Sequence, residues 1–289
     1  MESFMRNSST INRYKNKIIS AFLKRRYSKG RNIKSLKNEG TVPPIVVSMT
    51  SFSPRLDNLY IALGSLFNQS LQPNKIVLYL GDDVEKEKIP ESIKKLVKHG
   101  LEIRFVDDLK SHKKYYYSLR EYGDSLVVTV DDDLIYHKDM IKKLYDTYCA
   151  FPECICAMRT HEILYDGQGI PLPYSKWIKN SQRYNVASTD LFFTSGAGTL
   201  FPPHCFDERA FDLETIKKLS FSADDVWLNC MCRLIGRKIV NVPLNNHERS
   251  LLKINHTQDQ ALKFYNLYDS GNDTAVKNLV NEFGKESFR

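Results

Sequence analysis

The stretch Leu126-Val127-Val128-Thr129-Val130-Asp131-Asp132-Asp133 decides the fold, because it joins a buried strand to a cluster of acidic side chains. A run of β-branched and aliphatic residues is typical of a strand that is covered on both faces in a parallel sheet. The aspartates then lie where the chain leaves the carboxyl end of the sheet, which is where open α/β sheets bind ligands. Carboxylates this close together raise one another's pKa unless a cation lies among them. A divalent metal ion is the simplest such cation, so we predict one at this position.

Strand and helix patterns alternate along the chain from residue 41 onward. This alternation predicts an α/β fold with a mostly parallel sheet, right-handed crossovers and helices on both faces. The predicted strands are residues 45–49, 75–80, 101–106, 126–130, 154–159 and 238–242. The predicted helices between them are residues 56–67, 90–97, 113–122 and 139–148. Residues 160–190 have no regular pattern, and irregular loops of this length are usually functional.

The composition narrows the class of protein. At 289 residues the chain can bury a sizeable core, and its apolar share of 42% is ordinary for a globular protein. No run approaches the roughly 20 apolar residues of a membrane span, and no segment has the pattern of a secretory signal. The six cysteines lack CxxC spacing and are expected to be buried free thiols. We therefore expect an intracellular protein.

The net charge of +8 comes from residues 1–40, which hold eleven of the 42 basic residues and two of the 34 acidic ones. The rest of the chain is nearly neutral, so we expect no nucleic-acid partner. In this basic N-terminal arm, Ile11, Ile18 and Phe22 follow helical spacing. Such a helix would lie on an anionic membrane surface, and a solvated tail is the alternative. We expect a cytoplasmic protein that is either free or peripheral on the inner face of the cell membrane.

A second acidic pair, Asp224 and Asp225, precedes a helical pattern, and Lys113 and Lys114 precede the aspartate strand by one helix. Two separate acidic clusters suit group transfer from a nucleotide diphosphate. The first cluster would hold Mg²⁺ or Mn²⁺ against the leaving diphosphate. The second would take the proton from the attacking hydroxyl. Capping of the following helix is the structural alternative for the second pair.

Five motifs in this order resemble bacterial glycosyltransferases of the GT-A fold, in the nucleotide-diphospho-sugar transferase superfamily. They are residues 47–52, 65–70, 113–115, 131–133 and 223–228. The resemblance is strongest to polysaccharide-biosynthesis enzymes related to the inverting family that contains cellulose and chitin synthases, and it covers roughly residues 43–260. It implies a GT-A type, Rossmann-like sheet in a single catalytic domain. It also implies a hexosyltransferase-like enzyme that moves a sugar, most simply from a UDP-sugar, to a glycan or lipid-linked acceptor in surface polysaccharide or capsule synthesis.

The resemblance also implies roles for the matched residues. The nucleotide and donor sugar would be bound by Thr50, Ser51, Phe52, Arg55, Asp82, Lys114, Asp131, Asp132, Gly196 and Gly198. Asp131 and Asp133 match the outer positions of a DxD motif, and they would bind the metal with His256, for which His247 is the alternative. Lys114 would approach the diphosphate, and the glycines would lie against the donor sugar.

On the acceptor side, Asp225 matches the position of the catalytic base. The inverting family has Glu-Asp where this chain has Asp-Asp, so Asp224 remains an alternative base and the stereochemistry of transfer stays open. Tyr174 and Trp177, from the irregular loop, are predicted to contact the acceptor, with Trp177 stacking on a sugar ring. The other tryptophan, Trp227, is at helical spacing and is predicted to lie in the core.

The predicted organisation is a basic arm, residues 1–40, followed by a catalytic domain, residues 41–289. Residues 41–135 would bind the nucleotide, residues 136–260 the acceptor, and residues 261–289 would form a tail. A sugar-1-phosphate nucleotidyltransferase is an alternative, although residues 50–55 lack the glycine-rich loop of that class. A non-catalytic carbohydrate-binding protein of the same fold is another alternative.

Overall fold

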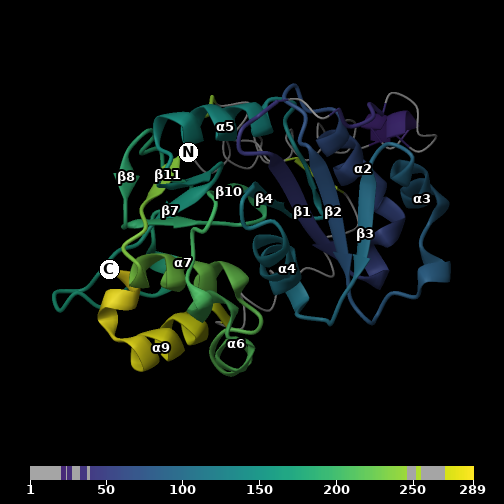
Figure 1. Ribbon diagram of the computed structural model, residues 1–289. Helices are drawn as coiled ribbons and strands as arrows, with labels where there is room; N and C mark the ends of the chain where they lie inside the picture. The colour runs from purple at the N-terminus through teal and green to yellow at the C-terminus, as the bar shows by residue number, and fades with distance from the viewer. Residues whose placement is uncertain (1–20, 24, 28–32, 38–39, 246–251, 255–270) are drawn as a thin grey trace, which may run out of the picture.

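The computed structural model describes residues 21–23, 25–27, 33–37, 40–245, 252–254 and 271–289 (Figure 1). Most of the basic arm lies outside the described residues, as do His247 and His256, but residues 21–23 and 25–27, where the predicted helix ends, are described and helical. The described part of the arm is not separate from the domain, because Tyr27 and Ile33 are buried in its core. The domain therefore includes residues before position 41, the boundary that the sequence predicts.

An eight-stranded sheet forms the centre of the molecule, in the order β3-β2-β1-β4-β10-β6-β11-β8 (Figure 1). Neighbouring strands are parallel from β3 to β4 and between β6 and β11, whereas β10 and β8 are antiparallel to their neighbours. The strands are β1 (Ile45–Ser51), β2 (Lys75–Leu80), β3 (Leu101–Phe105), β4 (Leu126–Val130), β6 (Ile155–Ala157), β8 (Ala187–Ser188), β10 (Ala197–Phe201) and β11 (Ile239–Asn241). The predicted mostly parallel α/β sheet is confirmed.

Helices pack on both faces of this sheet (Figure 1). The first core cluster joins the sheet to α2 (Leu56–Phe67), α3 (Glu91–Val97) and α5 (Met140–Ala150). The second joins it to α4 (Lys113–Glu121), α6 (Leu213–Leu219), α7 (Asp224–Leu234) and α9 (Gly271–Phe283). Strand β4 serves both, because Val128 points into the first cluster and Val127 into the second, as the alternation of a strand requires. Trp227 is fully buried in the second cluster, as predicted.

Two small antiparallel sheets lie beside the main one. They pair β5 (Leu134–Ile135) with β12 (Leu252–Lys253) and β7 (Thr160–Glu162) with β9 (Leu191–Phe193). The segment between β7 and β9 is largely irregular, as predicted, and contains one turn of 3-10 helix at Tyr174–Lys176. In the described part of the chain, no helix is long and apolar enough to cross a membrane.

The topology brings the predicted motifs to one edge of the sheet. Strands β1 and β4 are parallel neighbours, and Met49 pairs with Val130, so both chains leave the sheet side by side. Strand β10 starts at the same edge, because the amide of Asp131 donates a hydrogen bond of 3.0 Å to the carbonyl of Gly196. The acidic motif and the glycine-rich segment are therefore in direct contact.

Candidate active site

The two acidic clusters meet at Lys114, in the first turn of α4. The ammonium of this buried lysine lies 2.8 Å from Asp131 Oδ1 and 3.1 Å from Asp224 Oδ2. Burial alone would lower the pKa of Lys114, but the charges of Asp131 and Asp224 outweigh it and raise the pKa above its ordinary value. Lys114 is therefore a fixed positive charge between the clusters. The sequence predicts that Lys114 faces the donor diphosphate, and the structure shows that it also contacts the acidic pair.

Asp132 points into the protein and not toward a ligand. Its side chain is buried and forms an ion pair with Arg55, and it accepts a hydrogen bond of 2.7 Å from the Ser51 hydroxyl. Burial raises the pKa of Asp132 to about 6, although Arg55 opposes this shift. The donor-binding roles of Asp132, Ser51 and Arg55 stay predictions, and in the structure these side chains contact one another. Together they hold the turn after β1 against the turn after β4.

Arg55 and Lys114 supply the positive charge that we assigned to a metal ion from the sequence. Arg55 also lies 3.8 Å from Asp133, so each of the three carboxylates has a protein cation nearby. Among the described residues, no group of three or more His, Cys, Asp or Glu side chains is arranged to hold a metal ion. Asp131 and Asp133, whose side chains are 39% and 16% exposed, could offer two carboxylates. The described residues alone therefore do not fit a complete protein-bound metal site.

Asp224 and Asp225 share Ser195, which precedes the glycine-rich segment. The Ser195 amide donates a hydrogen bond of 2.8 Å to Asp225 Oδ1. The Ser195 hydroxyl lies 2.9 Å from Asp224 Oδ2 and 2.5 Å from Asp225 Oδ1. A hydroxyl carries one proton, so the Ser195 hydroxyl donates to one of the two carboxylates at a time. Neither aspartate caps α7 through its side chain, which argues against the capping alternative.

The environments of these two aspartates drive their pKa values apart. Burial would raise the pKa of Asp224, but the charges of Lys114 and His112, together with hydrogen bonds, outweigh burial and lower the pKa to about 2. Burial and the neighbouring charge of Asp224 raise the pKa of Asp225 to about 6. Asp224 is also buried, whereas Asp225 is only partly buried. Asp225 is thus the member of the pair that can exchange a proton near neutral pH.

Gly196 leaves room for the carboxylate of Asp131. A Cβ at Gly196 would lie 1.7 Å from Asp131 Oδ2, a distance that no side chain can occupy. The Tyr136 hydroxyl donates a hydrogen bond of 2.7 Å to the Gly196 carbonyl and fixes this segment. Gly198 has a φ of +103°, and its missing Cβ makes room for Met140. Both glycines are therefore required by neighbouring protein atoms, in addition to the predicted contact with a donor sugar.

The predicted nucleotide side of the site lies at the ends of β1 and β2. The Thr50 hydroxyl donates a hydrogen bond of 3.0 Å to the Tyr79 carbonyl. Asp82 is exposed at the end of β2, and Asp83 accepts a hydrogen bond from the Ser53 amide. Phe52 lies against the guanidinium of Arg55, 5.1 Å from its ring centroid. Thr50, Phe52 and Asp82 thus share one edge of the sheet, as predicted.

The prediction for Trp177 is wrong. Its side chain is 3% exposed and lies between Tyr174 and Phe192, with ring centroids 4.9 and 5.1 Å away. The indole N–H donates a hydrogen bond of 2.7 Å to the Leu172 carbonyl. A ring enclosed in this way cannot stack on a sugar. Tyr174 is also largely buried, but burial and then the charge of Asp225 raise its pKa, which places it near the acidic pair.

The site includes residues that the sequence analysis missed. Ser195 joins Asp224 to Asp225, and Arg159 donates a hydrogen bond of 2.7 Å from Nε to the hydroxyl of Thr194. The position of Ser195, directly before the glycine-rich segment, was an available signal. Nothing in the sequence around Arg159 distinguishes it from a surface residue.

The fold and the site define an α/β protein with two acidic clusters at the carboxyl edge of a parallel sheet. No protein-family model matches the chain, and no curated protein sequence matches it. Among solved structures, it is similar to S. aureus TarS residues 1–349 in complex with UDP-GlcNAc, with 12% identity and a TM-score of 0.47, over 70% of this chain and 56% of that one.

It is also similar to the mannosyltransferase PcManGT from Pyrobaculum calidifontis in complex with GDP-Man and Mn²⁺, with 12% identity and a TM-score of 0.44, over 81% of this chain and 64% of that one. The chain spans less than two thirds of the length of either protein.

Proposed function

We propose that the protein is a glycosyltransferase that moves a sugar from a nucleotide-diphosphate donor to a hydroxyl group of an acceptor. The contact of Lys114 with both acidic clusters carries this proposal. Lys114 places Asp131, whose carboxylate is suited to binding a donor complex, next to the pair Asp224 and Asp225, which is suited to proton transfer. Both lie at the carboxyl edge of the sheet, where α/β enzymes bind substrates.

Asp225 would act as the base. The acceptor hydroxyl gives its proton to Asp225 while its oxygen forms a bond to the anomeric carbon of the donor sugar. The bond between that carbon and the phosphate oxygen breaks, and its electron pair leaves with the nucleoside diphosphate. A carboxylate with a pKa of about 6 is ionised at neutral pH and is still basic enough to accept the proton. Asp224 would stay ionised because of Lys114 and would keep the pKa of its neighbour raised.

The donor diphosphate needs positive charge near Asp131. We propose that Mg²⁺ or Mn²⁺ binds together with the donor, with Asp131 and Asp133 as protein ligands and phosphate oxygens completing the coordination. The ion would neutralise charge on the leaving diphosphate. The PcManGT structure contains Mn²⁺ together with its donor. This arrangement predicts that the metal binds weakly to the free protein and tightly in the presence of the nucleotide.

We further propose a UDP-sugar as the donor and a glycan or lipid-linked acceptor of surface polysaccharide synthesis. A thermal-shift screen of UDP-, GDP- and dTDP-sugars, each with and without Mn²⁺, tests the donor. Nucleotide release in the presence of saccharide acceptors then tests transfer. Stabilisation by a nucleotide sugar, with release of the nucleoside diphosphate, supports the proposal. Release of pyrophosphate from a sugar 1-phosphate and a nucleoside triphosphate would instead establish a nucleotidyltransferase, and no response to any nucleotide would contradict both.

We propose that the basic arm binds an anionic membrane surface near the acceptor. Phe22 belongs to the apolar stripe predicted in the arm and is 61% exposed. Deletion of residues 1–20 leaves the packing residue Tyr27 in place, so the domain should stay folded. We expect the deletion to lower co-sedimentation with phosphatidylglycerol vesicles but not to change the little binding to phosphatidylcholine vesicles. Equal binding of both proteins to the anionic vesicles would exclude residues 1–20 as a membrane anchor.

A further inference from the structure

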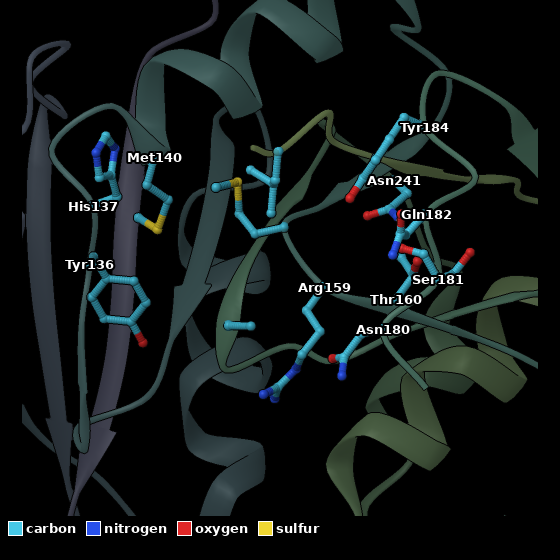
Figure 2. Close-up of a pocket in the computed structure, with 13 residues that line it drawn as sticks. Tyr136, His137, Met140, Arg159, Thr160, Asn180, Ser181, Gln182, Tyr184 and Asn241 are labelled. Carbon is cyan, nitrogen blue, oxygen red and sulfur yellow. The ribbon is translucent and has the colours of Figure 1, made fainter. Parts of the chain in front are cut away.

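A cavity of about 210 Å³ lies beside the candidate active site (Figure 2). Tyr136, His137 and Met140 line one side of it, and polar residues of the irregular loop, among them Gln182, line the opposite side. Ala197, which directly follows Gly196, also lines the cavity. One wall of the cavity is therefore next in sequence to Gly196, the glycine that contacts Asp131.

Arg159 connects the cavity to the second acidic cluster. It lines the cavity and donates a hydrogen bond to Thr194, the residue before Ser195. Ser195 in turn contacts Asp225. The cavity is thus connected through Arg159, Thr194 and Ser195 to the residue proposed to act as base.

Two buried polar atoms in the wall of the cavity lack partners. Thr160 Oγ1 and Asn241 Oδ1 form no hydrogen bond among the described residues, and both residues are almost completely buried. The orientation of the Asn241 amide is fixed, because its Nδ2 donates a hydrogen bond of 2.6 Å to the Ser181 carbonyl. Buried polar atoms without partners are rare in folded proteins and call for an explanation. A ligand with hydroxyl groups would supply the missing partners.

The chemistry of the wall defines the class of ligand. The lining residues include hydroxyl and amide side chains and one arginine, Arg159, whose Nε is bonded to Thr194, but no aspartate, glutamate or lysine. Met140, Met158 and Leu244 add apolar surface. Hydroxyl and amide groups beside apolar surface suit a sugar ring, which has hydroxyl groups at its edge and C–H groups on its faces. The cavity is smaller than the roughly 300–1,000 Å³ of pockets for drug-sized ligands, so it suits a single ring.

We propose that this cavity binds one uncharged sugar ring, with Thr160 and Asn241 bonded to its hydroxyl groups. The inference rests on the proposed function and assigns the sugar specificity of the same site. The ring is either the sugar of the nucleotide donor or the terminal sugar of the acceptor, because both present the same hydroxyl chemistry. The experiment distinguishes these two sources.

The central variant is Thr160→Val, which keeps the side-chain volume and removes the hydroxyl. Because this hydroxyl has no partner in the free protein, the variant should unfold at the same temperature as the wild type or at a higher one. Gln182→Ala, at an exposed position of the cavity, is a second variant that spares the core. Thr147→Val is the matched control, since Thr147 is a buried threonine of α5 that does not line the cavity.

The probes are UDP-glucose, UDP-GlcNAc and GDP-mannose against UDP and GDP for the donor, and the methyl glycosides of the same sugars for the acceptor. If the donor sugar occupies the cavity, Thr160→Val should bind the preferred nucleotide sugar about tenfold more weakly and the bare nucleotide unchanged. If the acceptor sugar occupies it, the loss should appear in glycoside affinity. Thr147→Val should change neither affinity.

The results also separate this inference from the proposed function. In one outcome the wild type binds nucleotide sugars, and Thr160→Val and Gln182→Ala bind both nucleotide sugars and glycosides with the same affinity as the wild type. This outcome overturns the cavity assignment but does not contradict the proposed function. A wild type that binds no nucleotide overturns the proposed function. In that case a glycoside affinity that is lost in Thr160→Val still supports the cavity as a sugar site, and no glycoside binding overturns it.

Discussion

The two acidic clusters consist of the same residue type but are built in different ways. In each cluster one aspartate is buried against a cation, Asp132 against Arg55 and Asp224 against Lys114. Burial is the largest influence at both, and at Asp132 it raises the pKa to about 6, whereas at Asp224 it is outweighed by Lys114, His112 and hydrogen bonds together, which lower the pKa to about 2. The difference shows that neighbouring aspartates take their roles from their partners. In the first cluster the buried aspartate, Asp132, holds the turn in place. In the second cluster the buried aspartate, Asp224, raises the pKa of its neighbour Asp225.

Lys114→Met should have the largest effect, because Lys114 is the contact between the clusters. We expect transfer to fall about a thousandfold, since the charge that keeps Asp224 ionised and orients Asp131 is lost. The removal of one partner of a buried ion pair should also lower the free energy of unfolding by about 3 kcal/mol. Rate measurements and urea unfolding check the two effects. Lys113→Met is the control, because the neighbouring buried Lys113 pairs with Asp108 and not with either cluster.

Asp225→Asn should break the second cluster while sparing the first. We expect kcat to fall about a thousandfold, as is usual for loss of a general base, with unchanged affinity for the donor and Mn²⁺ in calorimetry. Asp224→Asn should lower kcat less, because Asp225 remains as base. If Asp225→Asn transfers sugar at the normal rate, the base is Asp224 or another residue.

Gly196→Ala should break the first cluster while sparing the second. The new methyl group would meet the Asp131 carboxylate and displace it. A displacement of about 1 Å can cost a hundredfold in rate, so we expect a loss of that order, together with weaker donor binding. Gly167→Ala is the control, because a Cβ at Gly167 meets no atom within 4 Å. Normal donor affinity in Gly196→Ala would show that Asp131 does not contact the donor.

The pH dependence should show the smallest effect and sharpen the comparison further. Transfer requires ionised Asp225, so kcat should fall about tenfold per pH unit below pH 6 and level off above it. Asp132 and Asp225 have raised pKa values, so their contributions to stability are present at low pH and are lost as the pH rises from about 4 to 6.

Asp224 has a lowered pKa, so its contribution to stability is lost as the pH falls from about 4 to 2. Urea unfolding across this range checks both directions. Asp132→Asn should remove part of the loss of stability that accompanies a rise in pH from about 4 to 6. It should not change the pH profile of kcat. A rate profile that is flat down to pH 5 would contradict the assignment of Asp225 as base.

The fold was largely predictable because buried parallel strands leave a plain apolar signal. The runs at residues 45–49, 75–80 and 126–130 all form strands of one sheet. Their common direction places the motifs that follow β1, β2 and β4 at one edge, whereas the contact of Asp131 with the glycine-rich segment depends on the antiparallel strand β10 and was not predicted. Short strands such as β8 carry no comparable signal, because two residues show no periodicity.

The partners of the site residues were not predictable. Arg55 and Asp132 are separated by 77 residues, and no pattern in the chain relates them. The acidic cluster predicts a nearby cation, but no pattern in the chain shows that Arg55 and Lys114 also neutralise it. Trp177 was misplaced for a similar reason, because Phe192, which covers its ring, lies beyond the same irregular loop.

Strand β10 has a consequence for how the reaction geometry is maintained. Leu200 pairs with Val128 of β4 on one side and with Cys156 of β6 on the other, so the predicted nucleotide-binding and acceptor-binding halves share one continuous hydrogen-bonded ladder. The two halves cannot rotate about a hinge without breaking that ladder. The spacing between Asp131 and Asp225 is therefore set when the chain folds, so the proposed donor and acceptor would meet a preformed frame.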